Sequence, residues 1–200
     1  GAMPLSVQAC MRVLEFTPGD LIIVNDPYRG GTHLPDITMI SPVFVAEKLF
    51  ALVANRAHHS DVGGISPGSM PLSTDLFQEG VVIPPLKLVQ SGALKQDVWD
   101  LLLANVRTPK ERAGDLRAQM AANRRGTERV TDLIARYSAG DLAAAMRGLL
   151  CYSERMTRRL ISALPDGVYR YRDIMDDDGV TSGEVEIRVA VTIEGDFATV

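Results

Sequence analysis

Residues 37–46 read ITMISPVFVA and residues 49–54 read LFALVA, and only the polar pair Glu47-Lys48 separates the two runs. Two stretches rich in β-branched and other apolar residues on either side of a short polar connection are typical of a β-hairpin. Upstream, residues 21–24 read LIIV, a compact apolar run with the length of a buried strand. The first part of the chain is therefore predicted to be built on these strands.

The segments around these strands follow other patterns. A short amphipathic helix is predicted from Ser6 to the breaker TPG at 17–19, and a helical spacing of apolar residues begins at Leu94. We predict helices over 94–106, over 109–137 with Gly126 as a candidate interruption, and over 140–163. Strands are predicted at 168–173 and 186–193, around the turn DDDG at 176–179.

This order of elements predicts an α+β fold rather than regularly alternating β and α units. The fold has a β-rich N-terminal part with the hairpin, long central helices and a C-terminal β-hairpin. We divide the chain into a β-rich region over 4–92, a helical region over 93–165 and the C-terminal strands of a truncated domain over 166–200.

The composition is that of a globular protein with a real core, since 46% of the 200 residues are hydrophobic and 23% are charged. No uncharged apolar run is long enough to span a membrane, so we predict no membrane association. The N-terminus lacks a basic segment followed by an apolar one, and only two cysteines are present, Cys10 and Cys151. These features predict a cytoplasmic protein without a disulfide framework.

The formal net charge of −4 is unevenly distributed. Residues 107–136 carry 8 basic and 4 acidic side chains, and they form the only net-positive block of the chain. Because its basic residues alternate with Glu111, Asp115, Glu128 and Asp132 at helical spacings, the block is typical of a solvated helix face. We therefore predict a packing or subunit surface there, and no nucleic-acid partner.

All three histidines lie within residues 33–59, in segments rich in turn-forming residues. The predicted hairpin starts after His33 and Asp36 and returns at His58-His59, so these side chains are expected at one end of the sheet. Two imidazoles and a carboxylate can hold a divalent cation and leave open positions for substrate or water. Further ligands or hydrogen-bond acceptors behind them are expected among Asp26, His58, Asp61 and Glu79. The alternative is that these loops use His and Asp only for turns and caps.

Several motifs in and around these loops resemble one known family. They are GD at 19–20, DPY at 26–28, GGTHLPD at 30–36, NRAHHSDVGG at 55–64, PGSMP at 67–71, QEG at 78–80, NVRTP at 105–109 and GDL at 114–116. The chain resembles the hydantoinase B family, which includes the B subunit of N-methylhydantoinases, the matching region of 5-oxoprolinases and related acetone and acetophenone carboxylase subunits. The resemblance covers essentially the whole chain. Family members are longer, so this chain is expected to be an internal piece of such a subunit.

The resemblance implies ATP-dependent chemistry on a carbonyl compound. An A-type partner with an actin-like ATPase fold would use the ATP and phosphorylate the substrate oxygen, while this chain binds no ATP. The family's metal ligands map onto His33, Asp36 and His59, and they would hold zinc or manganese. Because they lie in or next to these motifs, Asp61 or Glu79 is our candidate to take a proton from water.

Three functions remain open on this basis. The first is a subunit fragment of an ATP-dependent hydrolase of cyclic amides such as hydantoin or 5-oxoproline. The second is a subunit of an ATP-dependent ketone carboxylase, and the third is a non-catalytic scaffold domain. For the first two, a hetero-oligomer is expected, and the isolated piece is expected to be inactive.

Overall fold

The computed structural model describes residues 2–200 and has the predicted α+β composition. The chain forms two compact units, one ending at Ala139 and one running from Gly140 to Val200, which are described separately below. The division of the sequence into regions over 4–92, 93–165 and 166–200 groups the elements by type, and as a division into domains it stays a prediction. Within the described residues, no helix combines the length and the apolar character that crossing a membrane requires.

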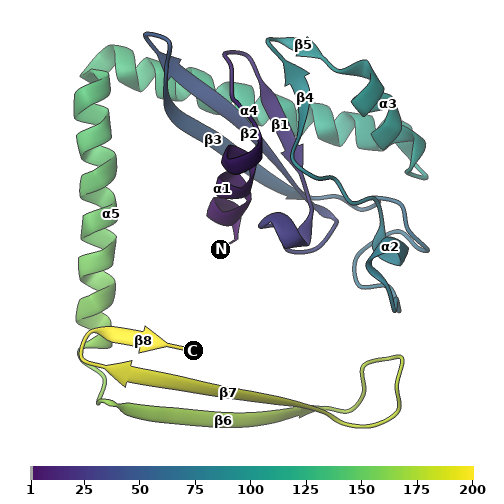
Figure 1. Ribbon diagram of the computed structural model, residues 1–200, viewed down its shortest axis with the longest axis vertical. Helices are drawn as coiled ribbons and strands as arrows, with labels where there is room; N and C mark the ends of the chain where they lie inside the picture. Colours follow the sequence, from purple (N-terminus) through teal and green to yellow (C-terminus); the bar gives the residue numbers. More distant parts are fainter. Residues whose placement is uncertain (1) are drawn as a thin grey trace. The chain divides into compact units, whose positions relative to one another are not determined.

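The first unit contains a five-stranded antiparallel sheet with the order β3-β2-β1-β4-β5 (Figure 1). Its strands are β1 (Leu21–Val24), β2 (Asp36–Val45), β3 (Lys48–His58), β4 (Leu86–Gln90) and β5 (Ala93–Leu94). The predicted hairpin is confirmed as β2 and β3, whose ladder runs from Val45↔Lys48 at the turn to Asp36↔His58 at the open end. Ala46 and Glu47 both have positive φ, 46° and 65°, as a tight hairpin turn compatible with strand twist requires.

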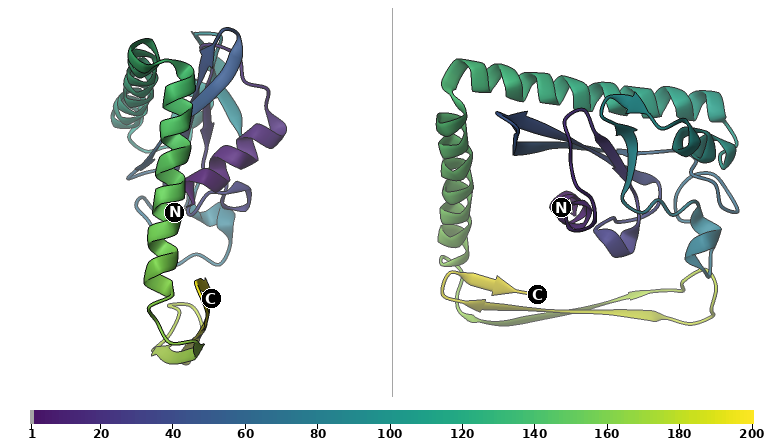
Figure 2. Two further views of the ribbon diagram at one scale, coloured as in Figure 1. Left: turned by 90° about the vertical axis from the view of Figure 1, so that its left-hand side faces the viewer. Right: turned by 45° about the horizontal axis from the view of Figure 1, so that its top comes forward.

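Alternation along β1 produces two apolar layers, one on each face of this sheet. Leu21 and Ile23 belong to a core with Trp99 and Leu116, whereas Ile22 and Val24 pack with Cys10 on the opposite face. The first layer is covered by helices α3 (Gln96–Ala104) and α4 (Pro109–Tyr137), and the second by α1 (Met3–Val13). The views in Figures 1 and 2 agree that α1 and α4 lie on opposite sides of the sheet.

The predicted helix to Tyr137 is confirmed as α4, which runs without a break through Gly126, the position considered as a weak point. A Cβ at Gly126 would lie only 2.5 Å from Cγ1 of Val53 on β3. The glycine therefore serves close packing of the helix on the hairpin and does not break the helix. Pro109 occupies the first helical turn, as predicted. Helix α3 starts later than predicted because Ala93 and Leu94 pair with β4 as the short strand β5.

The loop from β1 to β2 is held by the fully buried side chain of Asn25. Its Nδ2 donates hydrogen bonds to the carbonyl oxygens of Leu34 at 2.8 Å and Val81 at 2.9 Å. Its Oδ1 accepts a hydrogen bond from the Ile83 N–H at 2.6 Å. One side chain thus joins the loop that carries the first histidine to the segment before β4. A short 3-10 helix, η1 (Pro27–Arg29), and the helix α2 (Leu76–Glu79) lie in the connecting stretches.

The second unit contains most of α5 (Ala139–Ile161) and a three-stranded antiparallel sheet of β6 (Gly167–Met175), β7 (Val185–Glu194) and β8 (Phe197–Thr199). The predicted C-terminal hairpin is confirmed as β6 and β7. Ile193 is the only buried hydrophobic residue described in this unit. Apolar side chains such as Leu149, Leu150 and Tyr171 are exposed, so this unit has far less core than the first.

Replacing Asn25 by Ala is predicted to lower the free energy of unfolding of the first unit by about 3 kcal/mol. The change leaves two carbonyl oxygens and one N–H without their partner in a buried place. Trp99, the only tryptophan, lies in this core and reports urea unfolding of this unit by its fluorescence. The matched control is Asn105→Ala, which removes one exposed bond to the Leu101 carbonyl and is expected to cost less than about 0.5 kcal/mol. Equal midpoints for the two variants would contradict the role of Asn25.

Candidate functional site

The open end of the hairpin brings three of the predicted side chains together. Asp36 begins β2, and its Cα partner in the ladder is His58, the last residue of β3. Nδ1 of His33 lies 2.8 Å from Oδ2 of Asp36, which also accepts a hydrogen bond from Oγ1 of Thr32 at 2.6 Å. The rings of His33 and His58 lie 5.1 Å apart between centroids, inclined at 45°. His33, Asp36 and His58 therefore form one partly exposed cluster.

The Asp36 carboxylate is held in its ionised form. Burial by itself would raise the pKa of Asp36, but the hydrogen bond from Thr32 and the interaction with His33 outweigh burial and leave the pKa below its ordinary value of 3.8. The cluster thus places an ionised carboxylate beside two histidines.

His59 points away from this cluster, because successive side chains at a strand end face opposite sides. It is buried, and its Nε2 lies 3.0 Å from Oε1 of Gln119 on α4. Burial is the main reason that the pKa of His59 lies below its ordinary value of 6.5, and the positive charge of Arg112 lowers it further. The role of His59 as a metal ligand stays a prediction, and the geometry places His58 beside His33 and Asp36 instead. As the side chains stand, residues 2–200 contain no group of three or more His, Cys, Asp or Glu residues arranged to hold a metal ion.

Asp61 is buried and serves as an acceptor for several donors. Its Oδ1 accepts bonds from the Gly63 N–H and from Nη1 of Arg107, both at 3.0 Å, and its Oδ2 accepts the Arg107 N–H at 2.5 Å. Nη2 of Arg107 also donates to the Gly64 carbonyl at 2.7 Å. Burial would raise the pKa of Asp61, but these bonds and the arginine charge hold it below 3.8. These contacts make Asp61 a clamp between the Gly63-Gly64 loop and the residues before α4; its catalytic role stays a prediction.

Glu79 ends the short helix α2 and accepts a hydrogen bond from Oγ of Ser73 at 3.3 Å. Its expected role as a proton acceptor likewise stays a prediction.

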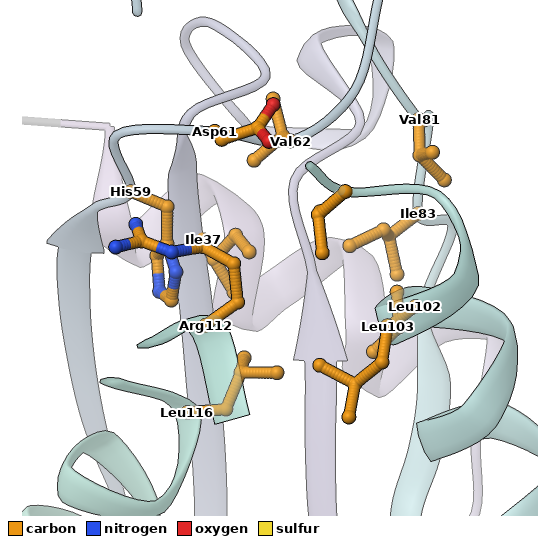
Figure 3. Close-up of a pocket in the computed structure, with 11 residues that line it drawn as sticks. Ile37, His59, Asp61, Val62, Val81, Ile83, Leu102, Leu103, Arg112 and Leu116 are labelled. Atoms are coloured by element: carbon orange, nitrogen blue, oxygen red, sulfur yellow. The ribbon is translucent and has the colours of Figure 1, made fainter. Parts of the chain in front are cut away.

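Two hollows adjoin His59. One is a small, partly open hollow of about 20 Å³, where His59 and Arg112 lie on one side and Ile83 and Leu102 across from them (Figure 3). This volume suffices for a single water molecule and not for a substrate. The other hollow is an open cleft of about 310 Å³ between the end of β3 and α4, lined in part by His58, Ser60 and Gln119. A volume of this size lies at the lower end of the range of small-molecule sites.

Sequence reasoning missed the buried polar residues of α4. Gln119 and Asn123 lie four residues apart on one helix face and are both buried against the hairpin. Asn123 Nδ2 donates to Oγ of Ser41 at 3.2 Å, and its Oδ1 accepts from Nδ2 of Asn55 at 3.0 Å. Because Leu116, Gln119 and Asn123 are spaced three and four residues apart, they share one helix face. This spacing was the signal in the sequence that could have predicted the burial of the two amides.

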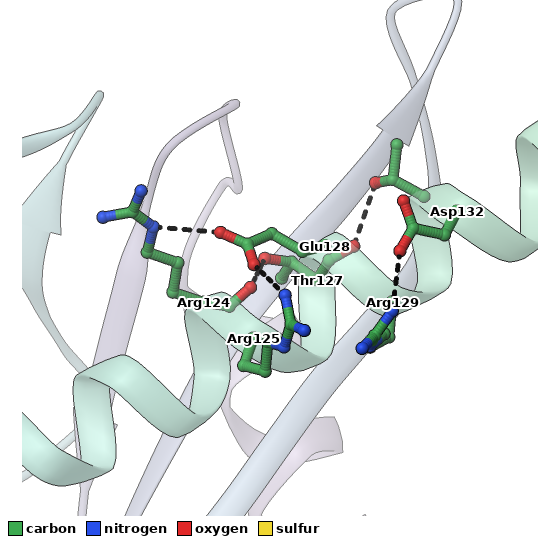
Figure 4. Close-up of polar contacts among 7 residues, drawn as sticks. Arg124, Arg125, Thr127, Glu128, Arg129 and Asp132 are labelled. Carbon is green, nitrogen blue, oxygen red and sulfur yellow. Dashed lines mark hydrogen bonds and ion pairs between the residues drawn. The ribbon is translucent and has the colours of Figure 1, made fainter.

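The exposed part of α4 carries the basic block found in the sequence. Glu128 lies 3.1 Å from Nε of Arg124 and 3.0 Å from Nη1 of Arg125, and Arg129 pairs with Asp132 at 3.3 Å (Figure 4). These pairs follow the predicted helical spacing. Because these pairs are exposed, solvent screens them and they contribute little to stability.

The site thus consists of His and Asp residues at the end of an antiparallel sheet, with the long helix α4 packed against the sheet. A known protein family matches this chain. The family model described as hydantoinase B/oxoprolinase matches residues 1–200. The chain belongs to this family, which confirms the resemblance seen in the sequence.

Similar proteins include members with different names. The putative B-type component of a D-/L-hydantoinase from Pseudomonas sp. (strain NS671) is 34% identical over 211 residues, covering 100% of this chain and 36% of that protein. The crystal structure of the ATP-dependent caprolactamase from Pseudomonas jessenii superposes with a TM-score of 0.89 at 33% identity, covering 98% of this chain and 35% of that chain. The acetophenone carboxylase delta subunit of Aromatoleum aromaticum is 35% identical over 173 residues, 86% of this chain and 25% of that protein. The chain thus spans about a quarter to a third of the length of these relatives.

Replacing Asp61 by Asn is predicted to destabilise the first unit by about 2 kcal/mol at pH 7, because charge-assisted bonds from Arg107 are lost. The folded-state pKa of Asp61 is below the ordinary value, so the carboxylate stabilises the fold above that value. Its contribution disappears as the pH falls through the folded-state pKa, and the gap between wild type and variant should close there. Urea unfolding followed at Trp99 over a pH series measures the gap. Asp132→Asn, in an exposed pair, is the control and should show a small gap at every pH.

Proposed function

We propose that this chain is part of a B-type subunit of an ATP-dependent complex that hydrolyses a cyclic amide. The observation that carries the proposal is the family match over residues 1–200, supported by similarity to a B-type hydantoinase component and to an ATP-dependent caprolactamase. Hydantoin and caprolactam are both ring compounds with an amide bond. The names of these two relatives therefore agree on the class of substrate, a small cyclic amide.

The proposed metal centre consists of His33, Asp36 and His58. The residue types fit a divalent cation, because imidazole suits zinc and a mixed nitrogen and oxygen set also suits manganese. As the side chains stand they do not form a ligand set, so the side chains of His33 and His58 would turn toward a cation bound beside Asp36. Three ligands leave positions for other groups. When bound, such a cation polarises a substrate oxygen or makes a bound water more acidic. His59, the ligand implied by the resemblance, presents Nε2 to Gln119 and is placed in a supporting role in this proposal.

The chain's own residues would hold the substrate beside this cluster. His58 belongs to the cluster and is also among the residues that line the 310 Å³ cleft, together with His59 and Gln119 on the α4 side, so a ligand in the cleft would lie at the same end of the hairpin. Asp61 and Arg107 would keep the Gly63-Gly64 loop in place at the same end of the sheet. ATP would be bound and consumed by an A-type partner subunit with an actin-like ATPase fold, so that the working assembly is a hetero-oligomer.

A ketone carboxylase subunit is the second candidate. The observation in its favour is the acetophenone carboxylase delta subunit, which is as similar to this chain as the hydantoinase component is. Both candidates need an activated carbonyl group, and they differ in whether water or bicarbonate reacts with it.

The metal assignment is tested by loading the purified chain with Zn²⁺ or Mn²⁺ and measuring stoichiometry by elemental analysis and affinity by calorimetry. One metal ion per chain is expected for the wild type. His33→Ala and His58→Ala should each weaken binding by at least about 100-fold, because each removes a direct ligand. The matched control is His59→Ala, which should bind more tightly than either. If His59→Ala abolishes binding while His58→Ala binds like the wild type, His59 is the third ligand. A His33→Ala/His58→Ala double variant with wild-type affinity would remove the site from this cluster.

The reaction class is tested with the full-length B-type protein, its A-type partner and ATP. We expect ADP formation coupled to ring opening of hydantoin, 5-oxoproline or caprolactam, and no turnover by the B-type protein without its partner. Product analysis with acetophenone and bicarbonate is the second arm. Carboxylation of the ketone without hydrolysis of any cyclic amide would overturn the hydrolase assignment in favour of the second candidate.

A further inference from the structure

One buried side chain on α4 connects the two strand ends that carry the proposed ligands. Nε2 of Gln119 donates a hydrogen bond to the Ile37 carbonyl at 2.7 Å, and its Oε1 lies 3.0 Å from Nε2 of His59. Ile37 directly follows Asp36 in the chain, and His59 directly follows His58. Gln119 therefore contacts the immediate neighbours of two proposed ligands, and it is itself only 5% exposed.

The orientation of this amide is fixed by its surroundings. The Ile37 carbonyl oxygen can only accept, so the amide nitrogen of Gln119 must face it and the amide oxygen must face His59. His59 must then carry its proton on Nε2 to donate to that oxygen. A single side chain thus fixes both the start of β2 and the ring orientation of the residue after β3.

Gln119 makes these contacts at the open end of the hairpin, where the β2–β3 ladder stops. Asp36↔His58 is the last pair of the ladder, and beyond it the chain leaves for the Gly63-Gly64 loop. Just beyond the pair, a backbone hydrogen bond from the His59 N–H to the Pro35 carbonyl, at 2.8 Å, joins the two strand ends. Ladder ends open at lower free energy than ladder centres. A bond to a rigid helix from each strand opposes that opening.

We propose that Gln119 is a positioning residue: through Ile37 and His59 it fixes the two strand ends that carry Asp36 and His58, so that these side chains can turn onto one metal ion. This inference rests on the metal centre of the proposed function and assigns to it a support that touches none of the ligands. Residues that orient metal ligands in this way typically alter metal affinity 10- to 100-fold when they are replaced.

Asn123 provides a matched comparison for a role in stability alone. It is fully buried on the same helix face, one turn further along, and bonds to Ser41 and Asn55. Ser41 lies five residues from Asp36, in the middle of β2. Removing the Asn123 amide should therefore weaken packing of the helix on the hairpin without releasing the strand ends.

The experiment compares four forms of the chain: wild type, Gln119→Met, Gln119→Glu and Asn123→Leu. Met has nearly the length of Gln and cannot make either bond, whereas Glu retains an acceptor for His59 and loses the donor to Ile37. Unfolding curves first establish a temperature at which all four are folded. Calorimetric titration with Zn²⁺, and separately with Mn²⁺, then gives their affinities. Nitrogen-15 spectra of the imidazoles report whether the His59 proton remains on Nε2.

We expect Gln119→Met to bind 10- to 100-fold more weakly than the wild type. Gln119→Glu should lie between these two, and Asn123→Leu should stay within about twofold of the wild type because the ligand spacing is retained. The His59 Nε2–H signal should change in Gln119→Met and persist in Asn123→Leu.

Two results would overturn the positioning role alone: wild-type affinity in both Gln119 variants, or an equal loss in Asn123→Leu, which would reveal a general effect of stability. A wild-type chain that binds neither metal would overturn the metal centre of the proposed function, and the positioning role with it.

Discussion

The pairing of Asp36 with His58 across β2 and β3 is the contact on which the candidate site depends. Side chains alternate along a strand, so a slip of one residue would exchange the faces of His58 and His59. The register is enforced by burial: Ile37 and Met39 enter the core under α3 and α4, while Ile40 packs with Cys10 on the opposite face. The hydrophobic pattern of the hairpin thus decides which histidine meets His33 and which meets the helix.

The interface between α4 and the hairpin combines this apolar packing with the buried side-chain amides of Gln119, Asn123 and Asn55. Gln119 and Asn123 satisfy carbonyl, hydroxyl and imidazole groups on both strands, whereas Oδ1 of Asn55 and Nε of Arg112 are buried without a hydrogen-bond partner. Each unpaired buried polar atom lowers the free energy of unfolding by about 1–3 kcal/mol. A wholly apolar interface would avoid this loss if stability were the only requirement. The amides instead fix the orientation of the groups around them, since each amide has one donor end and one acceptor end. That property suits a helix that has to hold strand ends at a set spacing.

Local patterns predicted the hairpin, the three long helices and the family, because strand alternation, helical spacing and Pro109 act over a few residues. They also predicted that His33 and Asp36 lie near the end of the returning strand. The choice between His58 and His59 was beyond them, since it depends on the exact pair at the end of the ladder. Asn25 reaches Val81 and Ile83, and Gln119 reaches Ile37, 82 residues away; only the folded chain brings such groups together. The packing role of Gly126 was beyond these local patterns for the same reason, because it depends on contact with Val53 of the hairpin.

The two sides of the loops that carry His33, Asp36 and His58 differ in a way that suits the proposed chemistry. Behind them, the buried Asn25, Asp61 and Gln119 bind backbone groups of the loops or strand ends, so that little conformational freedom is left there. In front, the side chain of His33 is 37% exposed and His58 is exposed as well. A site that is fixed from behind loses little entropy on binding a metal ion or substrate. Its open face leaves room for a carbonyl compound that has been activated on another subunit, a need common to amide hydrolysis and ketone carboxylation. The chain is 34% identical to a relative named for amide hydrolysis and 35% identical to one named for ketone carboxylation. A common step served by the matched region would explain why the two values are so close.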